Sequence, residues 1–218
     1  MRNYFLICII LIITGCNVKW SNGPGLCYAN RDYQNELREM PPFLVAHFPK
    51  EIDRLPITSA ITIDTTSQCI YYMLFEFGED KVLKLKKQIG EKYLAKYKSS
   101  DSCLTIVKLE AIRSMTDDKT SYDNICINNK YYYPLPFFES FDNSALEDGE
   151  KSKGIYSNKT KCGLPMDFQI YVLDSKPGHY WKGLYPLDYM PVGWKNGYSK
   201  GICINEKKGI IIYWGLIW

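Results

Sequence analysis

Few residues of this chain combine the types and the spacing that catalysis requires. The 218 residues include two histidines and eight cysteines. Cys162 and His179 could form a thiolate–imidazole pair, the combination that activates a cysteine nucleophile. Such a nucleophile usually lies in a recognisable local setting, and the Lys-Cys-Gly-Leu stretch around Cys162 is not one. Structural roles for both side chains are therefore favoured.

No other motif in the sequence indicates a reaction or a bound metal. A serine elbow, a phosphate-binding loop and a metal-binding doublet are all missing. Zinc is not expected, because no two cysteines have the close spacing of zinc ligands and histidines are scarce. Paired carboxylates for glycoside hydrolysis stay open, since such partners meet only in the fold. We expect no cofactor, no metal and a function without catalysis.

The first sixteen residues decide where the rest of the chain resides. Arg2 gives a positive start, residues 5–13 form an apolar run, and small residues follow before Cys16. The run is too short for a membrane span, because a spanning helix needs about 20 apolar residues. The closing residues Ile-Thr-Gly-Cys at positions 13–16 resemble the lipobox of bacterial lipoproteins. An ordinary secretory signal with a chance cysteine is the alternative.

The lipobox resemblance implies that residues 1–15 are removed and that Cys16 becomes the lipidated N-terminus. Several acyl chains would hold the protein firmly, because each buried methylene contributes about 0.8 kcal/mol. The residues after Cys16, Asn-Val-Lys-Trp-Ser-Asn-Gly-Pro-Gly, include no acid. Some Bacteroidota lipoproteins sent to the cell surface carry an acidic cluster there. We therefore expect attachment to the inner or outer membrane through Cys16, facing the periplasm.

Composition indicates one globular domain after the export segment. About 200 residues would remain, enough for a single domain with a substantial core. Hydrophobic residues make up 46% and aromatic residues 15% of the chain, which argues against disorder. The net charge of +3 argues against nucleic-acid binding. The expected organisation is a signal peptide over 1–15, a lipidated tether over 16–27 and one domain over 28–218.

Six cysteines would remain once Cys8 is removed with the signal and Cys16 is acylated. An even number in an oxidising compartment makes disulfides plausible. The alternative is that some of them are buried as small free hydrophobes. The six candidates are Cys27, Cys69, Cys103, Cys126, Cys162 and Cys203.

The hydrophobic patterns predict an α+β fold. We expect a mainly antiparallel sheet of about six or seven strands, with one principal helix packed on it. The helix is expected over 79–97, where apolar residues form a stripe opposite many lysines. That lysine face is either a solvated surface or a contact for an anionic membrane or an acidic partner. A weaker helix is expected over 28–40, and strands over 57–64, 69–77, 103–109, 123–128, 169–174, 201–205 and 210–218.

The stretch 176–198 is a long loop in which aromatic residues alternate with glycines and prolines. Tyrosine and tryptophan are common where proteins bind one another, because they bury large area with few rotatable bonds. The alternative is that these rings anchor the loop on the sheet. The candidate partner-binding residues are His179, Tyr180, Trp181, Tyr185, Tyr189 and Trp194.

Together these features predict a lipid-anchored protein of the cell envelope that binds a protein partner. One specific form is an immunity protein that blocks a toxin from a neighbouring cell. The alternatives are an envelope hydrolase acting on glycan or peptide, and a structural accessory of an outer-membrane complex.

Overall fold

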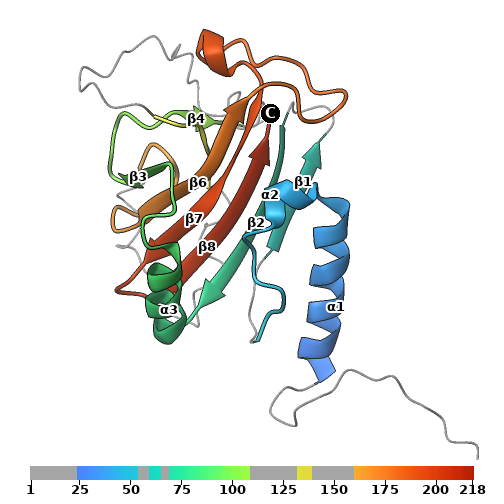
Figure 1. The fold of residues 1–218 in the computed structure, drawn as a ribbon, viewed down its shortest axis with the longest axis vertical. Coiled ribbons are helices and arrows are strands. Elements are labelled where there is room, and N and C mark those ends of the chain that lie inside the picture. Colours follow the sequence, from blue (N-terminus) through green and yellow to red (C-terminus); the bar gives the residue numbers. More distant parts are fainter. Residues whose placement is uncertain (1–23, 54–58, 65–68, 109–131, 139–159) are drawn as a thin grey trace, which may run out of the picture.

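The computed structural model describes residues 24–53, 59–64, 69–108, 132–138 and 160–218 (Figure 1). For residues 59–64 and 69–77 it describes the course of the backbone. The expected α+β class with an antiparallel sheet is confirmed.

The main sheet has the strand order β1-β2-β8-β7-β6-β3, and every neighbouring pair in it is antiparallel. The two C-terminal strands, which the sequence predicted over 201–205 and 210–218, form a hairpin near its centre. A bulge between Val172 and Asp174 interrupts the register of the pair β6–β7. The strands are β1 (Ser59–Asp64), β2 (Cys69–Phe77), β3 (Ala95–Lys98), β6 (Gln169–Pro177), β7 (Gly197–Asn205) and β8 (Ile210–Ile217).

The central strand β8 is buried along its whole length. Successive side chains of a strand point to opposite faces, so an unbroken apolar run requires cover on both faces. Ile210, Ile212, Trp214 and Leu216 join the core on one face, and Ile211, Tyr213 and Ile217 join the core on the other.

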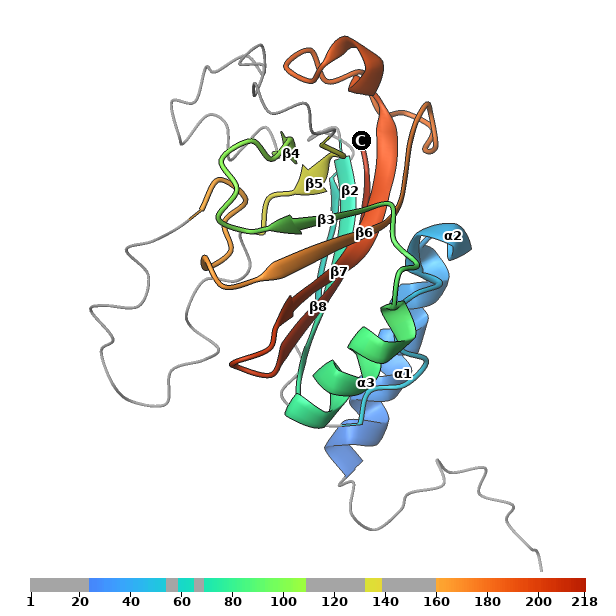
Figure 2. The same ribbon diagram turned by 60° about the vertical axis from the view of Figure 1, so that its left-hand side comes forward.

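Three helices cover one face of the sheet (Figure 2). They are α1 (Pro24–Glu39), α2 (Pro42–Val45) and α3 (Glu79–Ile89). A glycine lets α2 approach the sheet closely, because a Cβ on Gly215 would lie 2.7 Å from Cγ of Leu44. The opposite face carries loops and a short parallel pair, β4 (Ile106–Val107) and β5 (Leu135–Pro136).

The prediction of a helix over 79–97 is wrong for its second half. α3 ends at Ile89, where Gly90 adopts φ +48° and donates its N–H to the carbonyl oxygen of Lys86. The chain then turns and enters the edge strand β3. Tyr97 is buried because strand alternation points it inward, although it continues the helical stripe in the sequence.

The N-terminal helix is longer than the sequence predicted. α1 begins at Pro24, four residues before the expected helix and within the expected tether, and Pro24 suits the first turn because its missing N–H is not needed there. Its buried residues Leu26 and Tyr33 belong to the core between the helices and the sheet, the helix-side core. The strand expected over 123–128 lies outside the described residues.

Candidate functional site

The cysteine and the histidine considered as a catalytic pair do not share an accessible site. Cys162 is fully buried in the core, whereas the side chain of His179 is exposed. Burial raises the pKa of the Cys162 thiol, and Sγ lies 3.2 Å from Oγ1 of Thr160. A protonated, buried thiol is not a nucleophile.

The cysteines divide into two kinds. Cys27 in α1 and Cys103 after β3 are disulfide-bonded. Cys162 and Cys203 are free and buried, which corrects their inclusion among the candidate disulfide residues. Cys203 lies in the centre of the sheet, and burial raises the pKa of its thiol. Both act there as small hydrophobic residues.

The long aromatic loop, residues 178–196, crosses one end of the sheet. Its first part packs on the helix face through Trp181 and Leu184, and its second part packs on the opposite face through Leu187 and Met190. A one-turn 3₁₀ helix, Val192–Trp194, precedes β7. The loop is thus fixed to both cores although it has little regular structure.

Two of the six predicted binding residues have structural roles. Trp194 is only 8% exposed, and its carbonyl oxygen accepts a 2.7 Å hydrogen bond from Nε1 of Trp218. The hydroxyl of Tyr189 donates to the carbonyl oxygen of Lys108 at 2.8 Å and accepts from its N–H at 3.0 Å. Trp181 is half-buried against the helix-side core. Trp194 and Tyr189 are therefore removed from the candidate binding surface.

Other loop residues remain available to a partner. His179 and Tyr180 are exposed, Tyr185 is 68% exposed, and Val192 is 89% exposed at the start of the 3₁₀ turn. Large hydrophobic side chains with such exposure contribute little to the core, so their burial by a partner would be favourable.

The sequence did not reveal one aromatic residue of this surface, Phe43. It lies in α2, far from the loop along the chain, yet its ring centroid is 5.9 Å from that of Tyr180 and 4.9 Å from that of Tyr198. Tyr180 and Tyr198 meet edge to face at 4.5 Å. We call the exposed group Phe43, His179, Tyr180, Tyr185 and Val192 the aromatic end.

Polar contacts hold the base of the aromatic end. The hydroxyl of Tyr198 donates to Oδ2 of Asp174 at 2.6 Å, and burial together with this bond raises the pKa of Tyr198. Nζ of Lys200 donates to the carbonyl oxygen of Phe43 at 2.5 Å, which ties β7 to α2. Burial lowers the pKa of Lys200. These contacts hold the side chain of Tyr198 and the backbone of Phe43 in place.

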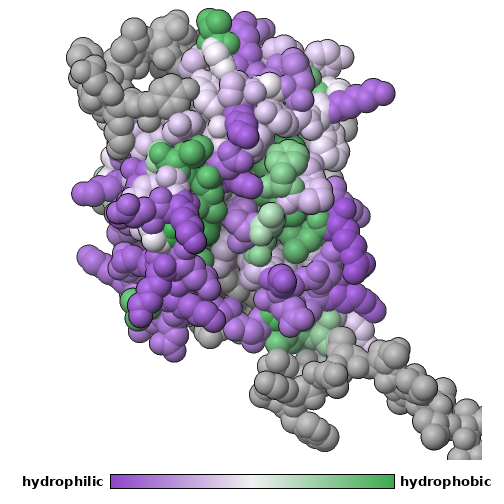
Figure 3. Space-filling view, viewed as in Figure 1, coloured by the Kyte–Doolittle hydropathy of each residue, from purple (hydrophilic) through white to green (hydrophobic). Residues whose placement is uncertain are grey.

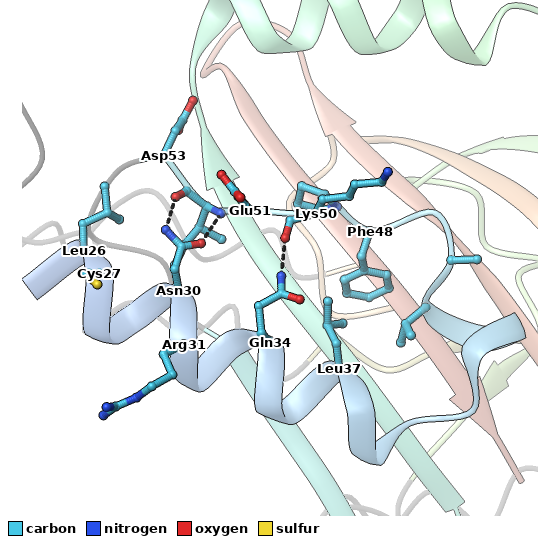
Figure 4. A pocket seen from close by; sticks show the side chains of 14 residues that line it. Leu26, Cys27, Asn30, Arg31, Gln34, Leu37, Phe48, Lys50, Glu51 and Asp53 are labelled. Atoms are coloured by element: carbon cyan, nitrogen blue, oxygen red, sulfur yellow. Dashed lines mark hydrogen bonds between the residues drawn. The ribbon is translucent and has the colours of Figure 1, made fainter. Parts of the chain in front are cut away.

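A groove of about 910 Å³ lies between α1 and residues 45–53 (Figure 4). Two amide side chains of α1 hold the facing segment. Asn30 donates to the carbonyl oxygen of Ile52 and accepts from its N–H, both at 2.7 Å, and Gln34 donates to the carbonyl oxygen of Lys50. Asp53 forms a 2.7 Å ion pair with Lys81 of α3. The apolar lining consists of Leu26, Leu37, Val45, Ala46, Phe48 and Ile52.

These contacts give the groove a structural role. Its amide groups satisfy the backbone of residues 50–52, so they are not available to a ligand. Four of its apolar residues, Leu26, Val45, Phe48 and Ile52, are already less than 9% exposed. The residues that line the groove therefore join α1 to the sheet side of the molecule, and they present few free groups for recognition.

Comparison with known proteins gives no family. No protein-family model matches the chain, and no curated protein or solved structure does either. Among the described residues, no group of three or more His, Cys, Asp or Glu side chains is arranged to hold a metal ion. None of the helices in that part of the chain has the length and apolar character needed to span a membrane.

Proposed function

We propose that this protein is a lipid-anchored component of the bacterial cell envelope that binds a protein partner through its aromatic end. The observation that carries the proposal is the position of the aromatic loop relative to the start of α1. Helix α1 begins at the lower end of the molecule, whereas residues 178–196 lie at the upper end (Figures 1 and 2). Acylation at Cys16 would therefore direct the aromatic end away from the membrane.

The chemistry of the aromatic end fits recognition of another protein. Binding hot spots are enriched in tyrosine and tryptophan, which combine apolar area with a hydrogen-bonding group. Phe43 and Tyr180 are partly exposed while their rings are held by contacts with Tyr198. Such pre-ordered rings lose little conformational entropy when a partner covers them. An immunity protein that blocks a toxin is one form of this function, supported by the small size and by the lipobox resemblance.

Lipid attachment is tested by replacing the proposed acylation site. Cys16→Ser is expected to leave an unprocessed precursor that incorporates no labelled fatty acid. Cys27→Ser is the matched control, because it also removes a cysteine near the N-terminus but should leave labelling intact. Labelled Cys16→Ser protein would refute the anchor.

Partner binding is tested by pull-down of the lipidated protein from cell envelopes, with captured proteins identified by mass. Tyr185→Ala is expected to weaken capture by about thirtyfold if Tyr185 is an anchor of the interface. Lys182→Ala, three residues away and also exposed, is the control and should change capture little. If capture by Tyr185→Ala and Tyr180→Ala equals that of the unchanged protein, the aromatic end does not bind the partner. Co-purification of a toxin would assign the immunity form.

A further inference from the structure

A second surface lies away from the aromatic loop, with α3 and the tip of the β7–β8 hairpin in the lower part of the molecule (Figures 1 and 2). It comprises α3, the turn and strand that follow, and the tip of the β7–β8 hairpin. Glu206 in this hairpin pairs with Lys86 of α3 at 2.7 Å, and Gly78 donates its N–H to the carbonyl oxygen of Gly209. Helix and hairpin tip therefore form one continuous surface, which we call the basic surface (residues 79–98 and 206–208).

The basic surface carries more positive charge than the whole chain. It contains nine lysines and four acids, a net charge of +5, whereas the full sequence has a net charge of +3. Lys86 is paired with Glu206, and Lys81 is paired with Asp53. The side chains of Lys84, Lys87, Lys92, Lys207 and Lys208 are exposed. Hydrophilic residues dominate this part of the molecule (Figure 3).

Exposed leucines lie among these lysines. Leu83 in α3 is 59% exposed, and Leu94 after the helix is 49% exposed. Lys84 follows Leu83 directly, and Lys87 lies one turn further along the helix. Lysines with intervening exposed apolar residues are typical of protein surfaces that lie on an anionic bilayer, where the charges meet headgroups and the leucines enter the interface.

The position of the basic surface agrees with this partner. In both ribbon views α3 and the hairpin tip lie in the lower part of the molecule, on the side where α1 begins (Figures 1 and 2). Cys16 precedes Pro24 by eight residues. A segment of that length reaches at most roughly 29 Å, about the size of a small domain, so the bilayer cannot be far from this end.

We propose that the basic surface rests on a bilayer containing anionic phospholipid and so fixes the orientation of the protein. This inference rests on the proposed lipid anchor at Cys16. The anchor supplies attachment, and the lysines supply a second, electrostatic contact that is weakened by salt. In this orientation α3 faces the membrane while the aromatic end faces the partner.

The test uses the full, lipidated protein with a nitroxide label at a single introduced cysteine. The label at Leu83→Cys reports on the basic surface, and the label at Tyr185→Cys is the matched control on the aromatic end. Cys162 and Cys203 are buried and should not be labelled in the folded protein. Vesicles contain either phosphatidylcholine alone or equal parts of phosphatidylcholine and phosphatidylglycerol.

With phosphatidylglycerol at low salt, the Leu83 label should become accessible to oxygen dissolved in lipid and lose access to a water-soluble relaxant. The Tyr185 label should stay in water. Lys84→Glu, Lys87→Glu and Lys207→Glu together should return the Leu83 label to water, since each lysine near an anionic surface strengthens the attraction by about fivefold. Lys50→Glu, Lys176→Glu and Lys182→Glu together are the charge-matched control and should leave it in lipid.

The outcomes separate this inference from the anchor. Protein that stays with the vesicles while the Leu83 label remains in water overturns this inference alone. Protein that stays with neither vesicle type overturns the anchor and this inference together. If the Leu83 label remains in water and the same lysine changes abolish capture of a protein, the basic surface belongs to an acidic protein partner instead.

Discussion

Nε2 of His47 donates to the carbonyl oxygen of Gly201 at 3.0 Å, and the carbonyl oxygen of Trp214 lies 3.1 Å from the same nitrogen. Two carbonyl acceptors on one nitrogen require that Nε2 carries a proton. This contact ties the segment after α2 to the paired strands β7 and β8. Burial, followed by the charge of Lys200, lowers the pKa of His47 to about 3.

The lowered pKa predicts that acid destabilises the fold through His47. In the unfolded chain this histidine takes up a proton near its ordinary pKa of 6.5, whereas folded His47 stays neutral down to about 3. The contribution is therefore complete above about pH 6.5 and is lost as the pH falls towards 3, by at most about 1.4 kcal/mol per pH unit. Urea unfolding at several pH values measures it. His47→Gln keeps an N–H donor without titrating, so it should flatten this part of the pH dependence, and an unchanged slope would contradict the assignment.

The close packing around Gly201, the residue that accepts the hydrogen bond of His47, predicts that a side chain at this position destabilises the fold. A Cβ at this position would lie 2.1 Å from the carbonyl oxygen of Tyr171 and 2.6 Å from the ring of Trp214. The oxygen belongs to the backbone of β6 and cannot move without disturbing the sheet. Gly201→Ala should therefore cost about 3 kcal/mol or more. Gly193→Ala is the control, because nothing lies within 4 Å of its Cβ. Equal urea midpoints for the two variants would show that the strands can separate locally.

The amide contact of Asn30 predicts a loss of stability without a loss of core packing. Asn30→Ala leaves both the N–H and the carbonyl oxygen of Ile52 without their partner. The expected cost is about 1 to 3 kcal/mol, because these groups are partly buried. Asn35→Ala on the exposed side of α1 should change the free energy of unfolding by less than about 0.5 kcal/mol. If Asn30→Ala changes the free energy of unfolding as little as Asn35→Ala does, water replaces the amide of Asn30.

The central strands could be predicted from the sequence for a simple physical reason. In β8 an apolar run of eight residues fits only a strand covered on both faces, and it begins directly after the turn 206–209. The end of α3 could not be predicted in the same way. Val82, Ile89 and Tyr97 continue one helical stripe in the sequence, yet Tyr97 reaches the core through strand alternation after Gly90.

The candidate site was predicted only in part. The loop 176–198 was recognised by its aromatic content, but composition does not distinguish rings that bind a partner from rings that anchor a loop. Trp194 and Tyr185 are similar signals in the sequence, but Trp194 is buried against Trp218 whereas Tyr185 is exposed. Phe43 gave no signal, since its neighbours Tyr180 and Tyr198 are distant in the chain.

The state of the cysteines predicts a definite labelling pattern. Cys162 and Cys203 are free, whereas Cys27 and Cys103 are disulfide-bonded. Alkylation of denatured, unreduced protein should therefore modify Cys162 and Cys203, and alkylation of the folded protein should modify neither, because both are buried. Mass mapping of the peptides checks each site. Reaction of Cys27 or Cys103 before reduction would contradict the pattern.

Substitutions of Trp194 and Tyr185, two aromatic residues of the same loop, are expected to change stability by different amounts. Trp194→Ala removes a buried ring that packs 5.9 Å from the ring of Trp218, so it should cost about 3 to 5 kcal/mol of stability. Tyr185→Ala removes a ring that is mostly in solvent and should change stability by less than about 0.5 kcal/mol.

Thermal and urea unfolding of both variants measure this difference, with far-UV circular dichroism as a check on the fold. If the melting temperature falls only for Trp194→Ala, the 3₁₀ turn anchors the loop to the core. Tyr185 is then not needed for stability and is free for recognition. A large loss of stability in Tyr185→Ala would instead show that the ring supports the fold, and the aromatic end would then lose its most exposed ring as a binding residue.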